Sequence, residues 1–242
     1  MSTTTFVLVH GAWHGGWCWG RVRPLLEAEG HRVLTPTQTG LGERAHLLSP
    51  AIDLELFAED IARVFLMEDL SDVVLVGHSF AGAAITGLAD RMPERLRQLV
   101  YLDALIVESG ETPMSRVPAE VAEQRMAASR AFDGGLSMPV PPPEAFGVTR
   151  PEDIGWIGGR LVPHPLRTFM SALTLANPIG NGVPATYIAC TEPWYGPLAS
   201  SRERARALGW PMREIATGHD AMVTAPGGLA RLLTDIAGRQ AG

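Results

Sequence analysis

The sequence predicts an α/β fold, in which helices cover both faces of a mostly parallel central sheet and a largely helical cap is inserted. Three observations lead to this prediction. Short apolar strand segments alternate with helical segments along the chain, and an apolar strand at 73–77 ends in the turn-forming sequence GHSFAG. A long stretch with many Pro and Gly breaks the alternation. We therefore expect a core at 1–107 and 178–242, and a cap at 108–177.

The first elements alternate strand and helix. The segment FVLVH predicts a strand over 6–10, and WGRVRPLLEAEG, after a Gly- and Trp-rich loop, predicts a helix closed by Gly30. HRVLTPT predicts a second strand over 31–37. The next helix begins after Asp53, which is placed to cap it, and its apolar face at helical spacing consists of Leu54, Phe57, Ile61, Val64 and Phe65.

The same alternation continues after the strand VVLVG. AGAAITGLADRM predicts a helix that ends before Pro93, and RQLVYLDAL predicts the strand that follows. Beyond the cap, PATYIAC and MREIA predict strands, SSRERARALG predicts a helix between them, and a last helix starts at Pro226. We expect the charged run RERARAL to face solvent, with Ala205 and Leu208 turned inward.

The composition favours a single domain that acts on small molecules. With 242 residues, 46% of them hydrophobic, the chain is long enough to bury a sizeable core. A net charge of -6 and the absence of a lysine cluster argue against nucleic acid and against an anionic membrane surface as partners. No secretory signal pattern or bilayer-length apolar segment is visible, so we expect a cytoplasmic enzyme; a homodimer stays open.

No cofactor or metal is expected. Cys18 and Cys190 lie far apart without C-x-x-C spacing, which indicates neither a zinc site nor a disulfide framework. GLGER lacks the Lys-Ser/Thr of a phosphate-binding loop, and GHSFAG does not fit the dinucleotide pattern G-x-G-x-x-G.

Chemistry-bearing residues follow several predicted strands. His10, Gly11 and Ala12 follow the first strand, Ser79 follows VVLVGH, Asp103 follows RQLVYL, and His219 follows MREIA. Ligands of an open parallel sheet gather at the carboxyl ends of its strands, so these residues are expected at one edge. A serine nucleophile needs a base, and the base needs a carboxylate that orients its ring; the chain order here is serine, acid, histidine. The amides of Ala12 and Phe80 are placed to form an oxyanion hole.

Three motifs carry a family resemblance. VLVHGAWHGGWCW, VGHSFAG and TGHDAM together resemble the branch of the α/β-hydrolase fold that contains plant methylesterases, hydroxynitrile lyases and related bacterial esterases. In that branch a glycine usually stands two places after the nucleophile, where this chain has Ala81. The acid usually follows the strand corresponding to PATYIAC, which offers only Glu192 here, whereas other members of the superfamily carry it at the place of Asp103. We favour Asp103 and keep Glu192 as the alternative.

The pocket is harder to predict. Trp13, Trp17 and Trp19 could form its floor, although we expect two of the three to pack in the core. His10 is expected to support the oxyanion loop. Other residues are expected either to line the pocket or, as the alternative, to pack in the core or in the cap, namely Gly11, His78, Trp156, His164 and Trp194.

The predicted reaction is hydrolysis of a carboxylic ester of a hydrophobic or aromatic small molecule, with an acyl-enzyme on Ser79. Lactone, carbamate or amide hydrolysis uses the same residues and stays open. A hydroxynitrile lyase is the first alternative, but such lyases typically carry a threonine and a lysine where this chain has Gly11 and Asp220. A ligand-binding receptor on the same fold is the second.

Overall fold

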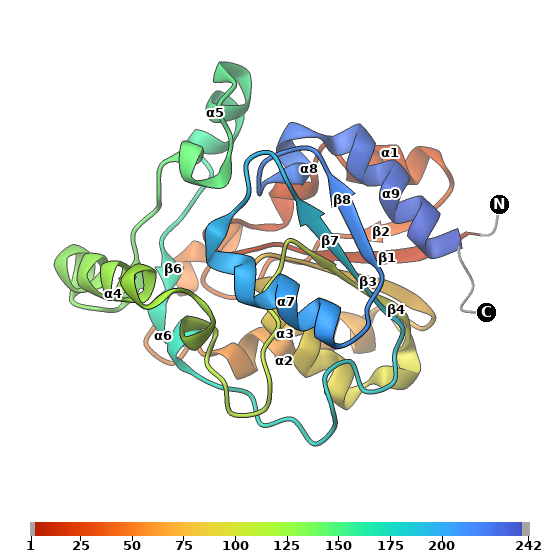
Figure 1. Cartoon of the computed structure of the whole chain (residues 1–242), viewed down its shortest axis with the longest axis horizontal. Helices are drawn as coiled ribbons and strands as arrows, with labels where there is room; N and C mark the ends of the chain where they lie inside the picture. The colour runs from red at the N-terminus through yellow and green to blue at the C-terminus, as the bar shows by residue number, and fades with distance from the viewer. Residues whose placement is uncertain (1–2, 239–242) are drawn as a thin grey trace.

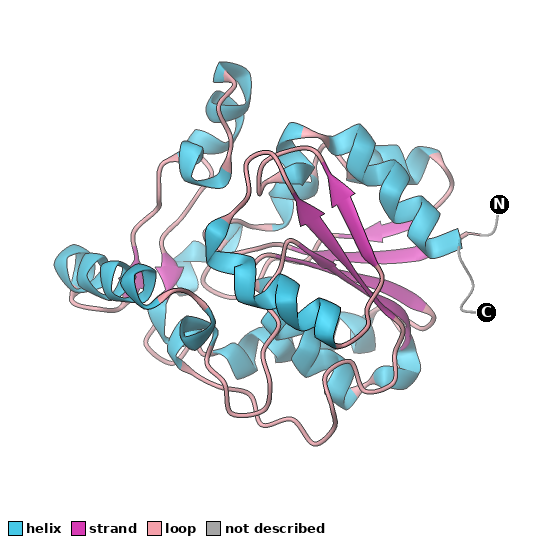
Figure 2. Ribbon diagram, in the orientation of Figure 1, coloured by secondary structure: helices cyan, strands magenta, loops and turns pink. Residues whose placement is uncertain are grey.

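Within residues 3–238, which the computed structural model describes, six parallel strands form the central sheet (Figure 2). The outermost residues of the predicted core, 1–2 and 239–242, lie outside the described part. The strand order is β2-β1-β3-β4-β7-β8. The bounds are β1 Thr5–Val9, β2 Arg32–Leu34, β3 Val73–His78, β4 Leu96–Leu102, β7 Ala185–Cys190 and β8 Met212–Ile215. The prediction of a mostly parallel α/β sheet is confirmed.

Burial explains why the strand segments are so apolar. Every residue of β3 and β7 is buried, whereas β2 and β8 at the two edges are partly exposed. In register, Val76 of β3 pairs with Leu8 of β1 on one side and Val100 of β4 on the other. A strand covered on both faces needs apolar side chains in both directions, so its sequence is a continuous apolar run rather than an alternation.

Helices cover both faces of the sheet (Figure 1). α1 and α9 lie on one face together with the short α8, and α2, α3 and α7 lie on the other. Asp53 accepts a hydrogen bond from the amide of Leu56 at 3.0 Å, which caps α2 as expected. The bounds are α1 Arg23–Ala28, α2 Leu54–Met67, α3 Ala81–Arg91, α7 Ala199–Ala207, α8 Ala221–Thr224 and α9 Pro226–Gly238.

The helix expected over 19–30 is shorter than the prediction. A turn of 3₁₀ helix at Gly16–Trp19 precedes it, and α1 itself begins only at Arg23. Pro24 stands in the first turn of α1, where its missing N–H costs nothing. Other 3₁₀ turns are Gly42–Leu47, Pro93–Arg95, Pro113–Arg116, Pro143–Phe146 and Gly196–Leu198.

The segment 108–177 extends beyond the sheet, on the side toward which β7 and β8 point (Figures 1 and 2). Besides helices it contains a two-stranded antiparallel pairing that the sequence does not predict, between β5 and β6. Its elements are α4 Ala119–Asp133, β5 Ser137–Met138, α5 Pro151–Gly158, β6 His164–Pro165 and α6 Leu166–Met170. Over the described residues, no helix is long and apolar enough to cross a lipid bilayer.

Candidate active site

The site lies where the strand order changes direction. β1 has β2 on one side and β3 on the other, so the loops that follow β1 and β3 separate above the carboxyl ends of their strands. The loop after β1 carries Gly11 and Ala12, and the turn after β3 carries Ser79. The loop after β4 brings Asp103 and the loop after β8 brings His219 to the same edge.

The turn at Ser79 is strained and firmly held. Ser79 has a φ of 55°, in the left-handed region that non-glycine residues rarely adopt. Its amide donates to the carbonyl oxygen of Leu102 at 3.1 Å, and its own carbonyl oxygen accepts from the amides of Gly82 and Leu105. These bonds to the end of β4 keep the Ser79 hydroxyl at the apex between β3 and α3.

Two glycines allow the close approach of the surrounding backbone. A Cβ at Gly11 would lie 2.8 Å from the Cβ of Ser79, so only glycine lets the first loop pass so near the serine. A Cβ at Gly82 would lie 2.1 Å from the carbonyl oxygen of Leu105, where α3 begins against the end of β4. Ala81, which replaces the glycine usual in the resembled branch, is buried at the start of α3.

Ser79, His219 and Asp103 form a continuous hydrogen-bonded chain. The Ser79 Oγ lies 2.8 Å from Nε2 of His219, and Nδ1 of His219 lies 2.7 Å from Oδ2 of Asp103. Asp103 is fully buried and His219 is nearly so. Glu192, the alternative acid, is exposed instead, and its amide donates to the carbonyl oxygen of Thr217. The structure therefore brings Asp103, and not Glu192, to the histidine.

Asp103 is ionised at neutral pH. Burial by itself raises the pKa of this carboxyl group, but the hydrogen bond from His219 and the positive charge of Arg202 outweigh burial and hold the pKa below its ordinary value. Arg202 donates from Nη2 to Oδ1 of Asp103 at 2.7 Å. Arg202 is only 4% exposed, so the expectation that RERARAL faces solvent is wrong at this position. Leu208, expected inside, is 42% exposed.

The two amides proposed for an oxyanion hole are free of internal partners. Among residues 3–238, neither the amide of Ala12 nor that of Phe80 donates a hydrogen bond. Both residues line the small cavity beside Ser79. Phe80 directly precedes α3, so its amide also lies at the positive end of the helix dipole.

Below the first loop lies a buried ion pair. His14 contacts the carbonyl oxygen of Ala12 through Nδ1 at 2.7 Å and the Oδ2 of Asp220 through Nε2 at 3.0 Å. Both neighbours are acceptors, so both ring nitrogens carry a proton. Burial lowers the pKa of His14, but the charge of Asp220 outweighs burial and raises the pKa above its ordinary value. The carboxylate of Asp220 thus pairs with His14, whereas the Nδ1 of His219 contacts Asp103.

One small cavity adjoins the serine, and a larger cavity shares part of its wall. A small one of about 10 Å³, which is about the room needed for one water molecule, reaches Ser79, and a larger apolar one of about 290 Å³ lies under α4. Four residues line both of them, namely Trp13, Arg125, Tyr195 and Pro197. The ring of Tyr195 stacks on that of His219 with 4.0 Å between centroids, and Arg125 Nη2 donates to the Tyr195 hydroxyl at 3.3 Å.

Of the residues expected in the pocket, Trp13 lines both cavities. Gly11 and His78 lie beneath the site, and His78 Nε2 donates to the carbonyl oxygen of His219. His164 is buried behind Phe80, where its Nδ1 accepts from the amide of Trp13. Trp156 of α5 packs against Trp17 and lines neither cavity.

Other positions have different roles from those expected of a pocket wall. Trp194 covers the guanidinium group of Arg202, and Trp19 is fully buried, as expected of a packing tryptophan. His10 bonds to Gly11 O and Gln38 N, and burial lowers its pKa to about 3. Arg125, Tyr195 and Arg202 were missed by the sequence reasoning.

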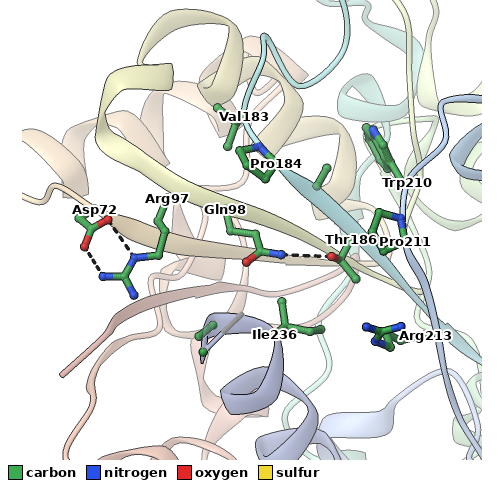
Figure 3. Close-up of a pocket in the computed structure, with 13 residues that line it drawn as sticks. Asp72, Arg97, Gln98, Val183, Pro184, Thr186, Trp210, Pro211, Arg213 and Ile236 are labelled. Atoms are coloured by element: carbon green, nitrogen blue, oxygen red, sulfur yellow. Dashed lines mark hydrogen bonds and ion pairs between the residues drawn. The ribbon is translucent and has the colours of Figure 1, made fainter. Parts of the chain in front are cut away.

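A larger groove of about 1130 Å³ lies at the amino ends of the strands, far from the serine (Figure 3). Asp72 and Arg97 form an ion pair on its wall, and Gln98 donates to Thr186 at 3.1 Å. Neither Ser79, Asp103 nor His219 lines it. The chemistry-bearing residues therefore gather at the opposite edge of the sheet.

Known proteins are similar to this chain in sequence. Residues 6–232 match the sequence model of the Alpha/beta hydrolase family. The chain is 39% identical to a carbendazim-hydrolyzing esterase of Nocardioides sp. (strain SG-4G), over 96% of this chain and 98% of that protein. It is 35% identical to Methylesterase 2 of Arabidopsis thaliana, over 54% of this chain and 48% of that protein.

Solved structures match this chain over nearly its whole length. An extracellular alpha/beta-hydrolase from a Paenibacillus species superimposes with a TM-score of 0.85 at 25% sequence identity. The match covers 98% of this chain and 99% of that one. The expected resemblance to plant methylesterases and bacterial esterases is thereby confirmed.

Proposed function

Because the chain belongs to the Alpha/beta hydrolase family, we propose that it hydrolyses carboxylic esters of hydrophobic or aromatic small molecules through an acyl-enzyme on Ser79. The observation that carries the proposal is the chain of two short hydrogen bonds from the Ser79 hydroxyl through His219 to the buried carboxylate of Asp103. A serine hydroxyl becomes a nucleophile when a correctly oriented base can accept its proton, and this geometry supplies that base.

In the proposed reaction Ser79 Oγ attacks the ester carbonyl carbon while its proton passes to Nε2 of His219. The imidazolium is stabilised by the ionised Asp103 and then gives its proton to the leaving alcohol. Water activated by the neutral His219 attacks the acyl-enzyme, which releases the acid and restores the serine. The free amides of Ala12 and Phe80 are placed to donate to the oxyanion in both steps.

The substrate class follows from the cavities and from the relatives. Apolar side chains dominate the larger cavity, including Trp13, Met138 and Val140, so it suits a hydrophobic or aromatic group. The small cavity at Ser79 leaves little room for the other half of the ester. The carbendazim-hydrolyzing esterase and Methylesterase 2 are both named as esterases, which supports ester hydrolysis as the reaction.

The test is a panel of aryl and alkyl esters assayed with the purified protein and with Ser79→Ala. We expect ester cleavage that depends on Ser79, with bulky aromatic esters preferred over small ones. Mandelonitrile in the same panel tests the lyase alternative: cyanide release that depends on Ser79, with no ester cleavage, would replace the esterase. Binding of aromatic esters without turnover would favour a receptor.

We also propose a cytoplasmic location. Cys18 and Cys190 are both buried and free, which suits a reducing compartment. Cell fractionation with an antibody against the chain tests this: recovery in the cytosolic fraction is expected, and recovery outside the cell would contradict it.

A further inference from the structure

We propose that Arg202 is a positioning residue that holds two of the groups around His219, the carboxylate of Asp103 and the segment of Tyr195, and that its positive charge sets the acid limit of activity. The inference rests on the proposed function, since it assigns Arg202 a part in the same site.

The first contact fixes the orientation of the triad acid. Asp103 Oδ2 accepts from His219, and the other oxygen, Oδ1, accepts from Arg202 Nη2 at 2.7 Å. Both oxygens are therefore engaged, and the carboxylate cannot rotate without losing a buried charge-assisted hydrogen bond. The backbone of Asp103 is held separately, because its amide donates to the carbonyl oxygen of Ile188 on β7 at 2.7 Å.

The second contact fixes the segment that covers the imidazole face. Arg202 Nη1 donates to the carbonyl oxygen of Tyr195 at 3.1 Å. The Tyr195 ring stacks on the His219 ring at an interplanar angle of 18°. One guanidinium group thus contacts both the carboxylate that binds Nδ1 of His219 and the segment whose aromatic ring stacks on the imidazole. Loss of Arg202 would loosen both supports together.

These contacts require arginine. Two nitrogens of one planar group donate in different directions, which a single lysine ammonium cannot reproduce with the same geometry. The Trp194 ring lies over the guanidinium with 4.1 Å from Cζ to the ring centroid, and this cation–π contact shields the charge from solvent. Trp194 itself is 49% exposed, so it forms the outer cover of the site.

The charge of Arg202 also acts on the protonation of Asp103. Burial raises the pKa of this carboxyl group, and the positive charge of Arg202 is one of the contacts that outweigh burial. Replacing Arg202 with a neutral side chain lets burial raise that pKa. Since the imidazole is oriented and stabilised by the ionised carboxylate, activity should then be lost at a higher pH as the solution is acidified.

Other charged or titratable groups near His219 stay in place in such a variant. They come from the neighbouring elements and loops: His78 at the end of β3, Asp103 after β4, Cys190 at the end of β7, Tyr195 before α7, Asp220 before α8 with its partner His14, and Arg125 of α4 through Tyr195. A change in the pH profile on substitution of Arg202 therefore reports the loss of its own charge.

The experiment compares Arg202→Met, Arg202→Lys and a matched control, Arg204→Met. Arg204 stands on the same helix and is also partly buried, but it pairs with Glu111 and does not touch the triad. Hydrolysis of an aryl acetate is followed by product chromatography from pH 5 to pH 9, and kcat and KM are determined separately. The wild type and Ser79→Ala are measured alongside.

For Arg202→Met we expect kcat to fall by about ten- to a hundredfold with a small change in KM, since displacement of a catalytic group mainly affects the chemical step. The acid limb of kcat/KM should move to higher pH by about half a unit or more. Arg202→Lys should keep the limb near its wild-type position and still lose kcat. Arg204→Met should leave the limb unchanged.

An unmoved acid limb in Arg202→Met, with a loss of kcat no larger than in Arg204→Met, would overturn the proposal. If Arg202→Met does not fold, Arg202→Lys decides, because a wild-type kcat in that variant would show that the two-pronged contact is not needed. Absence of Ser79-dependent activity in the wild type would instead overturn the proposed function, so the two failures are distinguishable.

Discussion

At the scale of single residues, Asp103 is distinguished from every other carboxylate near the site by its contacts. It is fully buried, and both of its oxygens accept hydrogen bonds from side chains that belong to the site, His219 and Arg202. A buried carboxylate in this setting stays ionised and keeps the imidazole in the tautomer that leaves Nε2 free to accept a proton. Its role depends on charge as well as on position.

Replacing the charge alone tests that role. Asp103→Asn should lower kcat on the order of a thousandfold or more, because the amide favours the wrong imidazole tautomer. Glu192→Gln serves as the matched control and should change kcat less than about twofold, since surface substitutions away from a site have small effects. Steady-state kinetics on one aryl ester compares the two. A large loss in Glu192→Gln with a small loss in Asp103→Asn would move the triad to Glu192.

The sequence limits the triad acid to Asp103 or Glu192, but it does not show which of the two carboxylates lies next to His219. Both follow a strand, and the deciding fact is which loop reaches Nδ1 of His219, a long-range property of the fold. The nucleophile was easier to predict from the sequence, because the turn at Ser79 depends on local residues: an apolar strand, a glycine at 77 and small residues after the serine.

At the scale of elements, α7 shows a signal that the sequence contained and that the interpretation missed. Leu198, Ser201, Arg202 and Ala205 are all buried and stand at spacings of three and four, which is one face of a helix. An arginine on the inner face of a helix needs a buried anion as partner, so helical spacing alone could have linked Arg202 to a carboxylate.

The position of the segment 108–177 could not be predicted in the same way. Its contact with the site depends on the short pairing of β5 with β6 and on the placement of α4, neither of which has a periodic pattern. This is why Arg125 was missed and Trp156 was expected in the pocket, although it packs against Trp17 on the outside. Proline and glycine mark where this segment bends but not where it lies.

Helix α4 offers a direct test of the larger cavity. Val121 lines that cavity, so Val121→Trp should fill part of it. We expect kcat/KM for a bulky aromatic ester to fall by about tenfold or more, while a small alkyl ester changes little. Glu123→Trp, exposed on the same helix, is the control for an added indole. Equal losses on both esters would show that the cavity does not hold the aromatic group.

At the scale of the whole molecule, the sheet was predictable because its strands are buried on both faces and its helices alternate with them. Those patterns are properties of short segments, and the parallel connection follows from the alternation. β2 is added on one side of β1, and β3 and the later strands are added on the other. The loops after β1 and β3 therefore separate at this point of the sheet, which positions the site.

Buried histidines give the molecule a predictable response to pH. Burial lowers the pKa of His10 to about 3, that of His78 to about 3, and that of His164 well below its ordinary value. Below the ordinary histidine pKa of 6.5 the unfolded chain therefore binds protons that the folded chain does not bind. Stability attributable to these histidines is present above pH 6.5 and is lost as the pH falls toward about 3.

The free energy of unfolding should fall by about 1.4 kcal/mol per pH unit for each such histidine below this threshold. His14 acts in the other direction, because its raised pKa gives stability that is full below pH 6.5 and lost as the pH rises. Urea unfolding at pH 7, 6 and 5 measures the net effect, and His46→Gln, at an exposed position, should keep the same slope. A stability that is constant over this range would contradict the account.

Ser79 is expected to be an activated nucleophile, and labelling with a fluorophosphonate tests this without any assumption about the substrate. The protein and its Ser79→Ala variant are treated alike, their intact masses are recorded, and the adduct is located by peptide mapping. One stoichiometric adduct is expected, located on Ser79 and absent from the variant. An unlabelled, folded wild-type protein, or an adduct at another residue, would contradict it.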